Sequence, residues 1–101
     1  MKIYVVNQAG HDISKAEQLG QIIILTEGQV NIFATDRILQ DLKEKMSGIN
    51  KEDYILLAGY SLLNVLACLI MLTKTGVLNV LLYNFKTKEY IKRQFTQEEV
   101  R

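Results

Sequence analysis

A chain of 101 residues is long enough for one domain with one hydrophobic core and too short for a separate catalytic domain. Apolar residues make up 49% and charged residues 23% of the chain, which is a globular composition and excludes a disordered one. A formal net charge of +1 gives no general attraction to nucleic acid. The single cysteine, Cys68, excludes an intrachain disulfide framework and favours the reducing cytoplasm.

The first predicted element is a short strand over residues 2–6, where Ile3, Val5 and Val6 are apolar. Residues 7–10 predict a turn, because asparagine and glycine tolerate left-handed backbone. Asp12 or Ser14 can then cap a short helix that ends at a stop glycine, residue 20.

A second buried strand is predicted over residues 21–25, where three isoleucines precede a leucine. Residues 26–28 close this strand. Residues 29–34 leave two alternatives open, because they could begin the next helix or run extended as a hairpin arm.

The second predicted helix begins at Thr35, with Asp36 in its first turn, where the helix dipole favours an acid. Its apolar stripe consists of Ile38, Leu39, Leu42 and Met46. Lys45 lies in the last turn and Gly48 is expected to end the helix. A solvated connection into the third strand is expected at Lys51, Glu52 and Asp53.

Three apolar blocks in the second half of the chain predict a strand, a helix and a strand. The outer blocks, residues 54–57 and 77–83, have strand length, and the middle block, Leu62–Leu72, has helix length. Turn residues separate the blocks: Gly59 and Ser61 precede the helix and Gly76 follows it. Strands joined by such a crossover are parallel and buried on both faces.

The last predicted strand spans residues 89–96, where polar and apolar residues alternate, and it follows a polar turn at residues 84–88. Lysine and arginine are typical of an edge strand that must resist self-pairing. Residues 98–101 are expected to form a frayed tail beyond a single domain spanning residues 1–97.

Together these elements predict an α/β fold of order βαβαβαββ. We expect a small three-layer, Rossmann-like and mostly parallel sheet of strand order 2-1-3-4, with a C-terminal antiparallel strand at its edge. The helix Leu62–Leu72 is apolar nearly all round, so one side should pack on the sheet and another on a second subunit, which predicts a homodimer.

Residues 54–73 carry no charge and are long enough to cross a bilayer. Gly59 and Ser61 interrupt this run, however, and Asn64 would be costly in lipid. A membrane partner is therefore disfavoured.

A ligand site is predicted at the carboxyl ends of the strands, where helix N-termini and glycines offer free backbone N–H groups to an anion such as a nucleotide phosphate. The candidate ligand-binding residues are Asn7, Gly10, His11, Asp12, Thr26, Glu27, Gly28, Gly59, Ser61, Asn64 and Tyr83. Asn84 follows Tyr83 at the same end of the sheet.

Several of these residues also have a purely structural interpretation. Gly59 and Ser61 could form a plain turn and cap. His11, the candidate catalytic residue, could act as an acid or base, or be a surface histidine beside a capping aspartate. Glu27 could accept a hydrogen bond from a ribose hydroxyl or be a turn residue. No metal-ligand spacing occurs, no nucleophile elbow surrounds Ser61, and no cofactor is predicted.

Four ordered strings carry a family resemblance: Val-Asn-x-x-Gly-His-Asp-x-Ser-x-Ala-Glu-x-x-Gly, Leu-Thr-Glu-Gly-x-Val-Asn-x-Phe, Asp-Tyr-Ile-Leu-Leu-x-Gly and Gly-x-Leu-Asn-x-Leu-x-Tyr. These strings resemble small proteins of phages and mobile elements, and the whole match covers most of the chain, from Val6 to about Arg93. The resemblance implies a phage or prophage origin and a role at the phage–host interface, and it transfers no catalytic residue. At fold level the predicted architecture is similar to Rossmann-like sensor domains that bind cyclic oligonucleotides across a dimer.

Three functional hypotheses follow from the sequence. The first is a non-enzymatic dimeric module that binds a nucleotide-derived ligand, with His11 and Ser61 on its phosphate, and that captures a nucleotide immune signal of the host. The second is a small phosphodiesterase that uses His11 as acid or base. The third is an inhibitor that binds a host protein through the basic hairpin carrying Lys86, Lys88, Lys92 and Arg93. The default interpretation of this hairpin is a solvated sheet edge, and contact with nucleic acid is a minor alternative.

Overall fold

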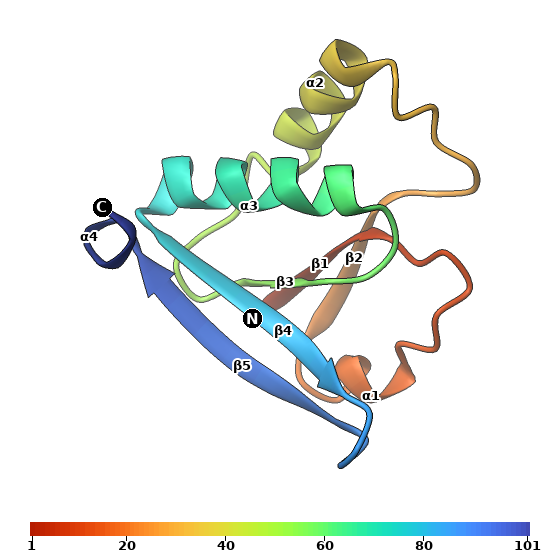
Figure 1. Ribbon diagram of the computed structural model, residues 1–101, viewed down its shortest axis with the longest axis vertical. Coiled ribbons are helices and arrows are strands. Elements are labelled where there is room, and N and C mark those ends of the chain that lie inside the picture. The colour runs from red at the N-terminus through yellow and green to blue at the C-terminus, as the bar shows by residue number, and fades with distance from the viewer.

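A computed structural model describes residues 1–101 and contains one five-stranded sheet of order β2-β1-β3-β4-β5 (Figure 1). The strands are β1 (Lys2–Asn7), β2 (Gln21–Thr26), β3 (Tyr54–Leu56), β4 (Val77–Asn84) and β5 (Glu89–Thr96). The first four strands pair in parallel and β5 pairs antiparallel to β4. The α/β fold, the strand order and the antiparallel edge strand predicted from the sequence are therefore confirmed.

Both faces of the central strands are buried, which is why these strands are mostly apolar. Ile55 of β3 lies beside Val80 of β4 in parallel register, and both side chains are buried. Along β1, Tyr4 packs in the larger core on one face and Ile3 in a smaller core on the other.

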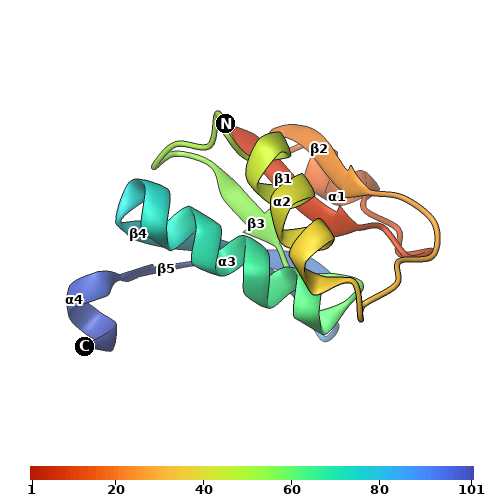
Figure 2. The ribbon, with the colours of Figure 1, turned by 90° about the horizontal axis from the view of Figure 1, so that it is seen from above.

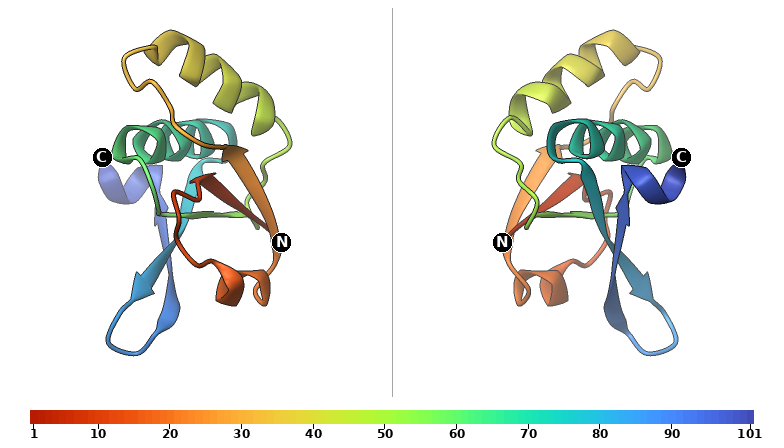
Figure 3. Two further views of the ribbon diagram at one scale, coloured as in Figure 1. Left: turned by 90° about the vertical axis from the view of Figure 1, so that its right-hand side faces the viewer. Right: turned by 90° about the vertical axis from the view of Figure 1, so that its left-hand side faces the viewer.

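Four helices complete the chain: α1 (Ser14–Glu17), α2 (Thr35–Lys45), α3 (Ser61–Thr75) and α4 (Gln97–Val100). Figure 3 shows α2 and α3 on one side of the sheet and the short α1 on the other, which gives the three layers. Seen from above, the C-terminal end of β5 and α4 project beyond α3 (Figure 2). Gly76 ends α3 in the left-handed conformation, with φ of 79°, as its position after the apolar block predicts. No helix has both the length and the apolar character needed to cross a membrane.

The structure corrects four local predictions. Residues 29–34 form neither a helix nor a hairpin arm but an irregular loop, in which the Asn31 side chain accepts a hydrogen bond from the Phe33 N–H. The first helix ends at Glu17 and the second at Lys45, each short of the glycine expected to stop it. Residues 98–101 are not simply frayed, because a capping box between Thr96 and Glu99 begins α4.

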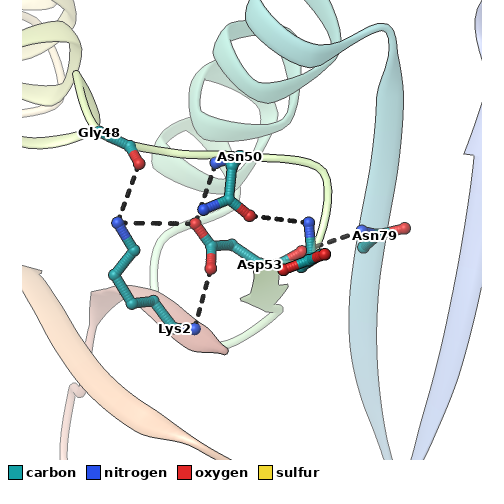
Figure 4. Close-up of polar contacts among 6 residues, drawn as sticks. Lys2, Gly48, Asn50, Asp53 and Asn79 are labelled. Carbon is teal, nitrogen blue, oxygen red and sulfur yellow. Dashed lines mark hydrogen bonds and ion pairs between the residues drawn. The ribbon is translucent and has the colours of Figure 1, made fainter.

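The fourth correction concerns Asp53, which is only 1% exposed instead of solvated. Its carboxylate accepts hydrogen bonds from the backbone N–H groups of Lys2 at 2.9 Å and Asn50 at 3.0 Å (Figure 4). The Lys2 ammonium lies 3.7 Å from the same carboxylate and donates to the Gly48 carbonyl. The buried side chain of Asn79 donates to the Asp53 carbonyl at 2.9 Å. This network joins β1, β3 and β4 at their amino ends.

Candidate functional site

The loop after β3 touches the end of β1 and divides the crevice expected at the carboxyl ends of the strands. Gly59 has φ of 79°, and a Cβ atom on it would lie 2.5 Å from the Asn7 carbonyl oxygen. Only glycine permits both this conformation and this approach. The close approach that requires glycine at residue 59 is therefore made by the Asn7 carbonyl of the same chain and not by a ligand.

Asn64, in the first turn of α3, holds this loop in place. Its side-chain amide donates to the carbonyls of Ala58 and Tyr60, both at 3.1 Å. The Asn64 Oδ1 atom is buried without a hydrogen-bond partner. The N–H groups of Asn64 are therefore engaged within the chain and not available to a ligand.

A first hollow of about 490 Å³ lies on one side of the Gly59 contact. The predicted ligand-binding residues that line it are Asn7, Gly10, Thr26, Glu27 and Gly28. The Asn7 side chain is used inside the protein, because it donates to the Thr26 hydroxyl and the Gly28 carbonyl, both at 3.0 Å, and accepts from the Ala9 N–H. The other lining residues that carry polar side chains are Gln8, Gln29 and Tyr60.

A second hollow, of about 450 Å³, lies on the other side and is named here the aromatic hollow. Three further predicted residues line it: His11, Asp12 and Tyr83. Its remaining lining consists of Ile13, Ser14, Lys15, Leu56, Leu57, Ala58, Leu82, Phe85 and Tyr90. Adjacent residues Gly10 and His11 therefore belong to different hollows.

Three aromatic rings from the β4–β5 hairpin form one wall of the aromatic hollow. The ring of Tyr83 meets those of Phe85 and Tyr90 edge to face, with centroids 5.0 Å and 5.2 Å apart. Phe85 is 83% exposed, so its ring is open to a stacking partner. Burial raises the pKa of the Tyr90 hydroxyl, which stays protonated at neutral pH.

Charged side chains of the β1–α1 segment line the same hollow. The Lys15 ammonium donates to the Lys88 carbonyl at 2.7 Å and so joins α1 to the hairpin. The Asp12 carboxylate accepts the Ser14 N–H at 3.0 Å, and this bond lowers the pKa of Asp12. His11 forms hydrogen bonds only through its backbone, so no neighbour orients its imidazole for proton transfer.

The remaining predicted residues, Gly59, Ser61 and Asn64, line neither hollow. Sequence reasoning did not select Lys15, Phe85 or Tyr90 as ligand-binding residues. The aromatic residues around the hairpin turn were a usable signal for two of them, whereas only the fold brings Lys15 to the hairpin. No group of three or more histidine, cysteine, aspartate or glutamate side chains is placed to hold a metal ion.

Comparison with known families identifies the chain. Residues 1–97 match the model of a family described as Phage Pam3 gp32-like protein, and this match includes every strand of the sheet. The chain belongs to this phage protein family. Membership in the gp32-like family agrees with the resemblance to small phage proteins seen in the four sequence strings. No curated protein and no solved structure matches the chain.

Proposed function

We propose that this gp32-like protein binds a nucleotide-derived ligand in the aromatic hollow without converting it. The observation that carries the proposal is that exposed aromatic rings, Tyr83 and Phe85, line the same hollow as the cationic or protonatable side chains of Lys15 and His11. Nucleotides combine a flat base with an anionic phosphate, and this pairing of surfaces suits both parts.

Each side chain then has a stated role. The Phe85 ring stacks on the base, a contact worth roughly 1–3 kcal/mol per base. Lys15 and His11 donate to phosphate oxygens. Asp12, which its lowered pKa keeps ionised at neutral pH, accepts hydrogen bonds from ribose hydroxyls. In a phage protein this site would capture a cyclic nucleotide signal of host immunity and so act against host defence.

Calorimetric titration with cyclic dinucleotides, linear nucleotides and NAD-derived cyclic molecules tests the proposal. We expect at least one of these probes to bind, and Phe85→Ala to weaken that binding about tenfold, a loss equal to one stacking contact. Phe33→Ala is the matched control, because Phe33 is 87% exposed and lies in the β2–α2 loop outside the hollow.

The proposal is wrong if none of the probes binds, or if Phe33→Ala and Phe85→Ala weaken binding equally. Chromatography of each bound probe after incubation separates capture from hydrolysis. Recovery of the intact probe is expected, whereas turnover that disappears in His11→Ala would support the phosphodiesterase hypothesis instead.

A second part of the proposal is that two copies pair through the outer side of α3. Val65 and Leu69 are 54% and 57% exposed there and line a groove whose lining includes no charged side chain. Sedimentation should give a dimer that Leu69→Glu converts to a monomer, while Phe33→Glu leaves it paired. If the unsubstituted protein is a monomer at micromolar concentration, the dimer proposal is wrong, whereas the ligand-binding proposal is unaffected.

A further inference from the structure

The outer edge of β5 offers unpaired backbone groups in a defined pattern. Leu81 of β4 accepts a hydrogen bond from the Leu57 N–H, so its backbone groups point toward β3 and away from β5. Lys92 lies opposite Leu81, and its own N–H and C=O therefore point outward. By the alternation of an antiparallel strand, the N–H groups of Tyr90 and Gln94 point outward as well.

Nothing in the chain covers the middle of this edge. Residues 92–95 are all exposed, which means that both faces of β5 are open along this stretch. The outward N–H of Thr96 is already bonded to the Glu99 carboxylate at 3.1 Å, so α4 closes one end of the edge. The available edge thus runs from Tyr90 to Gln94, with one carbonyl, that of Lys92, covered by the Arg93 guanidinium at 2.8 Å.

The charge of the hairpin selects the chemistry of a partner. The segment from residue 84 to residue 96 contains four basic residues and one acidic residue, although the whole chain has a net charge of only +1. A second copy of β5 paired antiparallel about Lys92 would place the two Lys92 side chains directly opposite each other, and pairing about Arg93 would do the same for the two arginines. Such like-charged pairs are destabilising. The edge therefore disfavours another copy of itself and favours an acidic strand.

We propose that β5 receives an extended acidic segment of a partner protein as a sixth strand of the sheet. On one face the partner strand lies beside Lys92 and on the other beside Arg93, so two adjacent partner residues carry carboxylates. Apolar or β-branched residues on either side of these carboxylates pack along Ile91 and Phe95. The backbone of the partner pairs with the outward groups of Tyr90, Lys92 and Gln94.

Selection from a displayed library of random peptides tests the proposal on the full chain. We expect the enriched peptides to contain adjacent acidic residues flanked by β-branched residues. Lys92→Pro should abolish their binding, since proline removes the outward N–H but no bond to β4. Lys92→Ala, which keeps that N–H, should lose only about tenfold through the missing charge.

Paired charge reversal gives a second measurement that does not depend on proline. In Lys92→Glu with Arg93→Glu, selection should enrich basic peptides instead of acidic ones. No enrichment on the unsubstituted protein, enrichment without acidic residues, or equal binding to Lys92→Pro and Lys92→Ala would each overturn the proposal.

Amide hydrogen exchange with an enriched peptide locates the contact. Exchange at Tyr90, Lys92 and Gln94 should slow roughly tenfold on binding, while Ile91 and Arg93, already bonded to β4, change little. Protection elsewhere in the chain without protection at these three amides contradicts strand addition. Phe85→Ala should leave peptide binding unchanged, so the result is independent of the nucleotide site.

Discussion

The two ends of the sheet are constructed in opposite ways. At the amino ends of the strands, Lys2 and the buried residues Asp53 and Asn79 are joined in one polar network (Figure 4). At the carboxyl ends, two hollows separated by the contact of Gly59 with Asn7 leave charged and aromatic side chains exposed.

This difference separates residues that stabilise the fold from residues free to bind. A buried carboxylate that accepts two backbone N–H groups is costly to remove, because both donors would be left unpaired. Exposed side chains such as Phe85 and Glu27 contribute little to stability, so they are available for contacts with a ligand. We therefore expect substitutions at the amino end to change the free energy of unfolding and substitutions in the hollows to change binding.

The largest expected effect is at the amino end. Asp53→Ala should lower the free energy of unfolding by about 3 kcal/mol, because two part-buried backbone N–H groups lose a charged acceptor. Glu27→Ala removes a carboxylate at the other end of the sheet and should change stability by less than about 0.5 kcal/mol. Urea unfolding of both variants measures this. Equal losses of unfolding free energy in the two variants would contradict the proposed difference between the two ends of the sheet.

The second largest effect is expected at the contact of Gly59 with Asn7, which divides the crevice. Gly59→Ala should cost about 2–3 kcal/mol, since it adds left-handed strain and a clash with the Asn7 carbonyl. Gly10→Ala has a similar φ of 80° but no atom within 4 Å of the added Cβ. It should therefore cost only the strain, about 1 kcal/mol. Thermal unfolding of the pair would contradict the division of the crevice if both variants lost the same stability.

A smaller effect is expected beneath the first hollow. The Thr26 hydroxyl donates to the Val6 carbonyl and accepts from the Asn7 amide. Thr26→Val should lower the free energy of unfolding by about 1 kcal/mol. Thr87→Val, in the exposed hairpin turn, is the control with no expected loss. An unchanged free energy of unfolding in Thr26→Val would mean that the two hydrogen bonds of the Thr26 hydroxyl contribute nothing to stability.

The smallest effect is the pH dependence contributed by Asp12. The Ser14 N–H lowers the pKa of Asp12 below its ordinary value of 3.8. The stabilisation is present above that ordinary value and is lost as the pH falls toward the lowered pKa. Urea midpoints at about pH 6 and about pH 3 should therefore differ slightly less in Asp12→Asn than in the unsubstituted protein. An identical difference in both proteins would exclude the Asp12–Ser14 contact as a source of pH dependence.

The sequence was sufficient for the strand order and for most element boundaries. The short apolar blocks at residues 54–57 and 77–83, the second containing a single asparagine, are joined by a helix-length block and leave little choice but adjacent parallel strands. Gly76 likewise ends α3 where predicted. The capping box of Thr96 and Glu99 was readable as Thr-x-x-Glu, and α4 was missed although its signal was local.

Only the tertiary structure decided the polar contacts between distant segments. Asp53 lies among charged residues and has the pattern of a solvated loop; it becomes buried because β1 brings the Lys2 N–H to it across 51 positions of sequence. The split of the crevice depends in the same way on Gly59 meeting Asn7, and the aromatic hollow depends on Lys15 reaching Lys88. Periodicity and turn residues report interactions within a few positions along the chain, and they therefore determine elements and their order. Contacts across strands depend on register and loop conformation, which are fixed only when the whole chain packs.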